Sequence, residues 1–182
     1  MKASDATRKL SATQIGAIAE NLIANELMIE SKGRLSPFQP VADDDGIDVL
    51  IYDKDTGKAV PIQIKARTNT VRKRGSTERG NIAHFIIKKS THRNDRHALL
   101  LCVLLSPDLR STQRAWLMPL NALHDLATVR ESTYVVRASK LTSSNDKYKK
   151  FRCENIAEIS RLLIRYFEGE CLPNTHFNFQ AR

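Results

Sequence analysis

Three polar side chains, those of Asp48, Gln63 and Lys65, have the chemistry of a site that binds a divalent cation and acts on a phosphate ester. Asp48 offers a carboxylate and Gln63 an amide oxygen, and a hard cation such as Mg²⁺ prefers oxygen ligands. The backbone carbonyl of Ile64 could supply a third ligand. Such a cation polarises a phosphoryl oxygen and lowers the pKa of bound water. The Lys65 ammonium would stabilise the negative charge that develops and position the attacking water.

Two short segments are expected to bring these side chains together. Residues 47–52 and 60–65 alternate apolar and polar side chains, which is typical of half-buried strands. If they pair as an antiparallel hairpin around a loop at 54–57, Asp48 lies directly opposite Gln63, with Cβ atoms about 5 Å apart. The other face of the hairpin is then uniformly β-branched: Ile47, Val49, Ile51, Val60, Ile62 and Ile64.

A helix ahead of the hairpin supplies a further carboxylate. Ser11 and Gln14 form a capping-box pattern, which predicts a helix that ends near Met28 or Glu30. Glu20 lies at the edge of the apolar stripe of this helix and can point toward the hairpin. Glu26 competes for the same role, because it projects onto the middle of the stripe, which is formed by Ile15, Ala19, Leu22, Ile23 and Leu27.

The chain is basic, with 29 Lys and Arg residues against 20 Asp and Glu residues, a net charge of +9. A surplus of this size suggests a polyanionic partner. Bases gather between residues 66 and 96, next to an acidic stretch at 43–55, although two solvated loops of opposite sign would give the same pattern. The candidate contacts to a nucleic-acid backbone are Arg67, Arg72, Lys73, Arg74, Arg79, Lys88 and Lys89.

Composition and length favour a single globular domain over residues 1–182, with a flexible leader at 1–10 and an undetermined tail at 170–182. Three widely spaced cysteines argue against a disulfide framework or a zinc knuckle, and the early residues lack the apolar core of a secretory signal. The longest apolar run is too short to cross a bilayer. We therefore expect a cytoplasmic protein with no membrane partner.

The remaining elements follow from periodicity. Residues 68–81 have no hydrophobic pattern and are expected to form a basic loop, and residues 82–87 could be a strand or a helix. The other expected strands cover 34–41, 97–105, 115–120 and 134–138, and the other expected helices cover 121–127 and 154–167.

The strings Gly16-xxx-Glu20, Gly46-Ile47-Asp48 and Gln63-Ile64-Lys65 together resemble the PD-(D/E)XK nuclease superfamily. The resemblance covers about residues 13–67. It is closest to the branch in which glutamine replaces the usual acid of the last motif, as in certain intron-encoded homing endonucleases, with Holliday-junction resolvases more distant.

This resemblance implies an α/β fold with a restriction-endonuclease-like αβββαβ core, a mixed central sheet flanked by helices, and an extra C-terminal strand and helix. It implies Mg²⁺-dependent hydrolysis of phosphodiester bonds in duplex or branched DNA, with Mn²⁺ as a substitute. Asp48 would be the central metal ligand, Glu20 and Gln63 its helpers, and Lys65 the catalytic lysine. A homodimer is compatible with such an enzyme.

The sequence departs from the family pattern in two ways. Gln63 removes one negative charge from the metal site, and no helix pattern is evident between Lys65 and His97. Two other functions stay open: an inactive DNA-binding or assembly module on the same fold, and a basic module that binds RNA or protein. In either case Asp48, Gln63 and Lys65 would be only the solvated face of an amphipathic hairpin.

Overall fold

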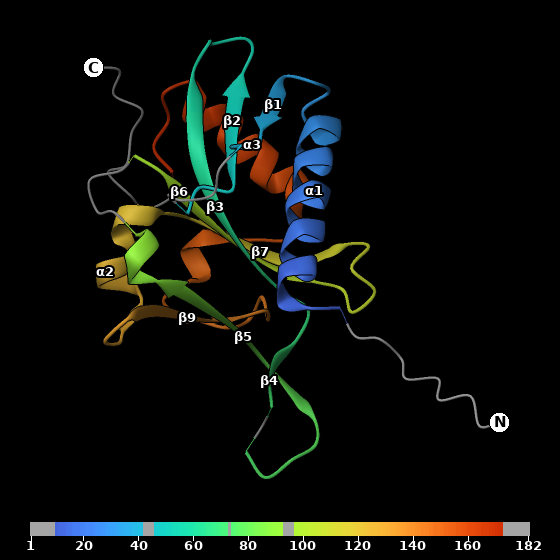
Figure 1. Ribbon diagram of the computed structural model, residues 1–182, viewed down its shortest axis with the longest axis vertical. Coiled ribbons are helices and arrows are strands. Elements are labelled where there is room, and N and C mark those ends of the chain that lie inside the picture. Colours follow the sequence, from blue (N-terminus) through green and yellow to red (C-terminus); the bar gives the residue numbers. More distant parts are fainter. Residues whose placement is uncertain (1–9, 42–45, 73, 93–96, 173–182) are drawn as a thin grey trace, which may run out of the picture.

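A computed structural model describes residues 10–41, 46–72, 74–92 and 97–172 (Figure 1). The expected leader and tail therefore lie mostly outside the described residues. The helices are α1 (Ala12–Glu30), α2 (Leu123–Leu126) and α3 (Ile156–Phe167), with short 3-10 turns η1 (Lys89–Thr91), η2 (Leu120–Ala122) and η3 (Lys149–Phe151). The strands are β1 (Leu35–Phe38), β2 (Val49–Asp53), β3 (Ala59–Arg67), β4 (Thr70–Arg72), β5 (Arg79–Lys88), β6 (Leu99–Leu105), β7 (Thr112–Pro119), β8 (Thr128–Val129), β9 (Thr133–Ser139) and β10 (Arg152–Cys153).

The strands form a larger and a smaller sheet. The larger sheet has the order β1-β2-β3-β6-β7-β10, and its neighbouring strands are antiparallel except β3 and β6, which run parallel. Helices α1 and α3 contact each other and pack in one core with one face of this sheet. The smaller sheet, β4-β5-β9-β8, forms a second core on the other face with α2. The expected α/β class, with a mixed central sheet flanked by helices, is confirmed.

Strand β6 lies inside the larger sheet and is buried along its whole length. Alternate side chains enter the two cores, so both of its faces are covered. A strand covered on both faces must be apolar at every position, which explains why its sequence is an uninterrupted apolar run rather than an alternation. The expectation of a buried strand within 97–105 is confirmed.

The β2–β3 hairpin has the register that the sequence predicted. Val49 lies opposite Ile62, and the three pairs that follow keep the same register. Ahead of the strand the Asp48 amide also donates a hydrogen bond to the Ile62 carbonyl, at 3.1 Å, so the regular pairing does not continue to Asp48. Five of the six β-branched residues enter the core beneath α1 and α3. The prediction for Ile47 is wrong: it packs against the second core, because it precedes the strand and is not bound by the strand's alternation.

Residues 68–81, expected as a loop, contain strand β4 and the start of β5. Thr70 lies opposite Ala83 and Arg72 lies opposite Arg79, with an irregular register between the two pairs. Strand β4, Arg79 and the described turn residues 74–78 between them are called the arm below, and Figure 1 shows the arm extending away from the sheets. The loop expectation holds for residues 68–69 and 74–78 and is wrong for 70–72 and 79–81, which are strand. Hydrophobic alternation reports burial, and of these strand residues only Thr70 is buried.

The arm and β5 also form the connection between the parallel strands β3 and β6. A nuclease core of the expected type would place a helix there, whereas residues 68–92 of the described chain hold two strands and one 3-10 turn. Parallel strands need a long crossover connection, and here β4 and β5 of the smaller sheet form part of it. Residues 82–87, which the sequence left open, are therefore strand.

The two long helices begin where their caps predict. The Gln14 amide donates to Ser11 Oγ at 3.2 Å, and the Ser11 amide donates to Gln14 Oε1 at 2.9 Å, so the capping box of α1 is confirmed. Helix α3 begins after Asn155, whose side chain accepts a hydrogen bond from the Glu158 amide at 3.0 Å. Among the helices in the described ranges, none has the length and apolar character required to cross a bilayer.

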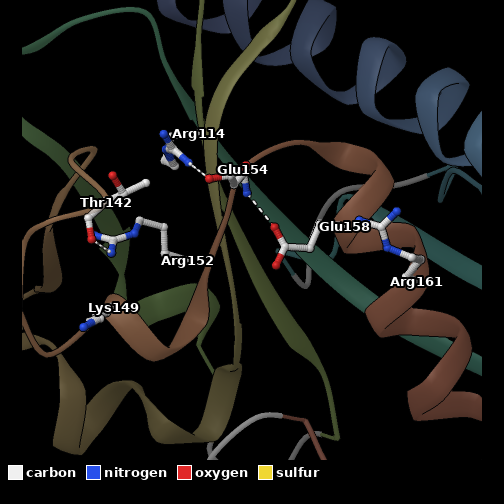
Figure 2. Close-up of a pocket in the computed structure, with 7 residues that line it drawn as sticks. All are labelled: Arg114, Thr142, Lys149, Arg152, Glu154, Glu158 and Arg161. Carbon is white, nitrogen blue, oxygen red and sulfur yellow. Dashed lines mark hydrogen bonds and ion pairs between the residues drawn. The ribbon is translucent and has the colours of Figure 1, made fainter.

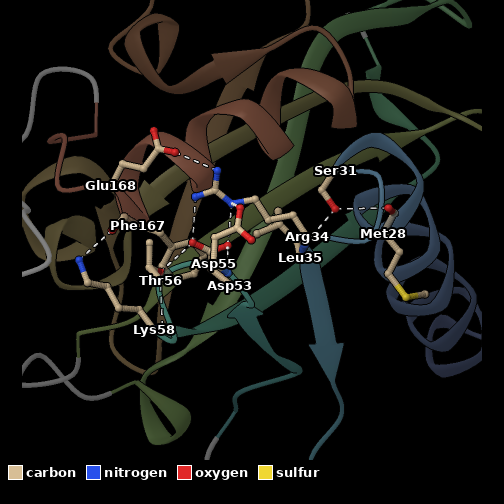
Figure 3. A network of polar contacts seen from close by, with 10 residues as sticks. All are labelled: Met28, Ser31, Arg34, Leu35, Asp53, Asp55, Thr56, Lys58, Phe167 and Glu168. Carbon is tan, nitrogen blue, oxygen red and sulfur yellow. Dashed lines mark hydrogen bonds and ion pairs between the residues drawn. The ribbon is translucent and has the colours of Figure 1, made fainter.

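A buried ion pair joins the turn end of the hairpin to the end of α3 (Figure 3). Arg34 donates to both carboxylate oxygens of Asp53 at 2.7 and 3.0 Å, and to Glu168 at 2.8 Å. Burial by itself would raise the pKa of Asp53, but hydrogen bonds from Arg34 and Thr56 outweigh it and hold that pKa below its usual value. The pair therefore stabilises the fold above the unfolded-state pKa of Asp53, and this stabilisation is lost as the pH falls through the lower folded-state pKa.

We predict that Arg34→Ala lowers the free energy of unfolding at pH 7 by about 3–5 kcal/mol, because it leaves the Asp53 charge buried without its partner. Urea unfolding at pH 7 and at acidic pH measures this effect, which should shrink once Asp53 is protonated. Arg165→Ala is the control, because it breaks the fully exposed pair with Glu170 and should change stability little. Equal losses for the two variants would contradict the prediction.

Candidate active site

The carboxylate of Asp48 is held firmly at the start of the hairpin. Its Oδ2 accepts a hydrogen bond from the Ile64 amide at 2.5 Å, and its side chain is only 8% exposed. The Lys65 ammonium lies 3.8 Å from the same oxygen. The hairpin register thus brings an acid and a base together on one face, as the sequence predicted.

Glu20 of α1 reaches the same place. Asp48 and Glu20 both line a pocket of about 210 Å³, between α1 and the segments on either side of residues 42–45. Glu26, the competing acid, lines a different pocket and lies 3.5 Å from the Thr112 hydroxyl. Six residues along a helix turn the side chain by about 600°, which points Glu26 away from Glu20. Of the two helix acids, it is Glu20 that the fold places beside Asp48.

Gln63 is buried rather than solvated. It follows Ile62, the residue of β3 that pairs with Val49, and its side chain is 1% exposed. Its Oε1 is buried and accepts no hydrogen bond from any described residue. Gly46 packs against it: a Cβ at that position would lie 2.9 Å from Gln63 Nε2 and 2.7 Å from the Thr91 Cβ, and the backbone has a φ of +69°. Both the contact and the φ require glycine just ahead of Asp48.

These residues have the donors that a hard divalent cation needs. A buried amide oxygen without a hydrogen bond is costly unless another positive partner meets it, and the Gln63 oxygen is of this kind. Two carboxylates, of Glu20 and Asp48, share one pocket, whose lining does not include Gln63. In the described part of the chain no three His, Cys, Asp or Glu side chains cluster.

The basic residues expected to contact nucleic acid fall into two groups. Four lie at the end of β3 and on the arm: Arg67, Arg72, Arg74 and Arg79. Lys88 and Lys89 lie at the opposite end of β5, and a strand of that length spans about 33 Å. Lys73 is outside the described residues. The structure therefore does not gather the candidates into one patch.

Arg137 and Arg130, which were not among the candidate contacts, belong to the part of the smaller sheet that β8 and β9 form. Arg137 of β9 lies opposite His84 of β5, and Arg67 donates to the His84 carbonyl at 3.2 Å. Burial, followed by the charges of Arg137, Arg67 and Arg130, lowers the pKa of His84, so the imidazole is neutral at pH 7. The pairing of β5 with β9 brings His84 and Arg137 together, and no local sequence pattern predicts that pairing.

A larger pocket of about 460 Å³ lies elsewhere and contains none of the expected site residues (Figure 2). Several of its charged groups already have partners within the chain, although the Nε of Arg114 is buried without a hydrogen bond to any described residue. Arg152 donates to the carbonyls of Leu141 at 2.5 Å and Thr142 at 2.8 Å, and Arg114 lies 3.6 Å from Glu154. The chemistry of Asp48 and Lys65, rather than pocket volume, identifies the candidate site.

No family model and no curated protein matches the chain. Among solved structures, it is similar to a bacterial homing endonuclease, I-Ssp6803I, with 13% sequence identity, 86% of this chain and 94% of that chain covered, and a TM-score of 0.49. It is also similar to Hjc, a Holliday junction resolvase from Archaeoglobus fulgidus, with 11% identity, 75% and 98% covered, and a TM-score of 0.40. These are the two kinds of nuclease that the sequence resemblance named.

Proposed function

We propose that the chain is a divalent-cation-dependent endonuclease that hydrolyses phosphodiester bonds in DNA. The observation that carries this proposal is the Asp48 carboxylate, which lies 3.8 Å from the Lys65 ammonium and shares a pocket with Glu20. The buried amide of Gln63 lies on the strand that bears Lys65, two residues before it. Oxygen ligands for a hard cation and a positive charge for a phosphate are thus side by side.

Glu20, Asp48 and Gln63 would hold the cation, and Mg²⁺ suits them because all three donors are oxygens. Mn²⁺ accepts the same ligands. When bound, the cation would supply Lewis-acid activation of the phosphate and of a water molecule.

The residues of the chain have distinct tasks around that ion. The Ile64 amide donates to Asp48 Oδ2 and so fixes the orientation of the carboxylate before substrate arrives. Lys65 stabilises the charge that develops on the phosphate oxygens in the transition state, where a preorganised positive group is most effective. Gln63 contributes an oxygen without adding a buried charge.

The nature of the substrate is inferred from charge. The chain carries a net charge of +9, and Arg67 lies two residues beyond Lys65 on the same strand. An extended backbone of phosphates is the polyanion that such a surface binds best, with an affinity that falls steeply with salt. Inactive binding to DNA, or binding to another polyanion, would be revealed by the experiments that follow.

We predict that Asp48→Ala and Lys65→Ala each reduce Mg²⁺-dependent nicking of supercoiled plasmid by about a hundredfold or more, which corresponds to roughly 2.7 kcal/mol of transition-state stabilisation. Their effects on metal binding should differ, because only Asp48 is a ligand. Mg²⁺ should therefore still raise the melting temperature of Lys65→Ala, but not that of Asp48→Ala.

Asp125→Ala is the matched control for these variants, since it removes an acid that is 87% exposed on α2. It should nick plasmid like the wild type. If all four proteins nick equally, the activity comes from elsewhere, and if none nicks with Mg²⁺ or Mn²⁺, the chain is not this nuclease.

We also predict that Gln63→Glu makes stability depend more strongly on metal. A buried carboxylate in place of the amide should lower the melting temperature in EDTA, because a second negative charge then lies near Asp48. Mg²⁺ should restore the melting temperature. Half of this recovery should occur at a Mg²⁺ concentration several-fold lower than for the wild type, because a carboxylate is the better ligand. Thermal unfolding over a Mg²⁺ series measures both effects.

Gln63→Leu is the control for Gln63→Glu, because it keeps the volume close but offers no oxygen. Its melting temperature should respond to Mg²⁺ less than that of the wild type. An identical metal response in all three proteins would remove Gln63 from the ligand set.

A further inference from the structure

The arm has no core of its own. From Arg72 to Arg79 every described residue is exposed, and Thr70 is the buried residue at its base. A two-stranded ribbon without a buried face is at best marginally stable in water. Its presence therefore contributes little to the fold, which points to a role in binding.

The register of the arm places like charges opposite each other. Arg72 pairs directly with Arg79 across the two strands, and such pairs destabilise a ribbon through repulsion. Arg79 uses one donor on the Thr70 carbonyl at 3.1 Å, and Arg74 follows at the turn. An anionic partner would relieve the repulsion, so the arm is built to bind one.

We propose that the arm enters the major groove of duplex DNA beside the scissile bond. This inference rests on the proposed function for the choice of DNA as the polyanion. The major groove of B-form DNA admits a two-stranded β-ribbon, and arginine is the side chain that most often reads guanine there. The deep, narrow major groove of A-form RNA does not admit one.

The distance along the chain limits where the arm can touch DNA. Arg72 follows Lys65 by seven residues, which span at most about 25 Å when fully extended. At about 3.4 Å per base pair, the Cα atoms of Lys65 and Arg72 are therefore no more than about seven base pairs apart along the DNA.

Equilibrium binding without divalent metal tests the arm independently of hydrolysis. The probe is a short fluorescent DNA duplex of mixed sequence, titrated with Asp48→Ala protein over a series of salt concentrations. Into this background we place the triple substitution R72Q/R74Q/R79Q, and we expect it to lose about 10- to 100-fold in affinity and to lower the salt slope by about two to three.

The matched control is K147Q/K149Q/K150Q, which removes the same charge from the exposed lysines around η3. It should keep its affinity within about threefold of the parent at the same salt. Equal losses for the two triple variants would mean that net charge, and not the arm, governs binding, and would overturn the proposal.

The groove is tested with modified probes. Methylation of guanine N7, which faces the major groove, should weaken binding of the parent protein, whereas a drug that fills the minor groove should not compete. Competition by the minor-groove drug without an effect of N7 methylation, or equal affinity for an RNA duplex, would overturn the proposal.

The two proposals can fail separately. Arm-dependent DNA binding without plasmid nicking would refute the nuclease function alone. Plasmid nicking with DNA binding that does not depend on the arm would refute the role of the arm alone.

Discussion

The geometry of the candidate site depends on one constraint, the pairing register of β2 with β3. Side-chain direction in a strand repeats every two residues, so a slip by one residue would exchange the faces of the hairpin. Five β-branched side chains on one face are buried beneath α1 and α3, and a slip would carry them out of that core. The burial that stabilises the hairpin therefore also places Lys65 on the face where its ammonium lies 3.8 Å from Asp48.

What could be predicted from the sequence is what local patterns encode. The cap of α1 needs only Ser11 and Gln14, which are three residues apart, and the hairpin register needs only alternation and a turn between two adjacent strands. The approach of Glu20 to Asp48 adds a single long-range step, the packing of an amphipathic helix on the apolar face of the hairpin. Each of these is a short-range pattern followed by burial of an obvious apolar surface.

The rest depends on contacts that no local pattern records. The arm escapes sequence reasoning because its strands bury almost nothing, so no alternation marks them. The pairing of His84 with Arg137 joins segments far apart in the chain. The burial of Gln63 is of the same kind: the sequence places it on a polar face, and only the packing of Gly46 and Thr91 over that face removes it from solvent.

The connection between β3 and β6 carries one more consequence. Its outermost part, from Arg72 to Arg79, has no described residue in either core, and it begins soon after the strand that bears Lys65 ends at Arg67. Exposed loop tips accept replacement and insertion far more readily than packed layers do. The solvent-facing tip can therefore change in length and charge while the buried scaffold beneath it, which carries Asp48 and Lys65, is inherited intact.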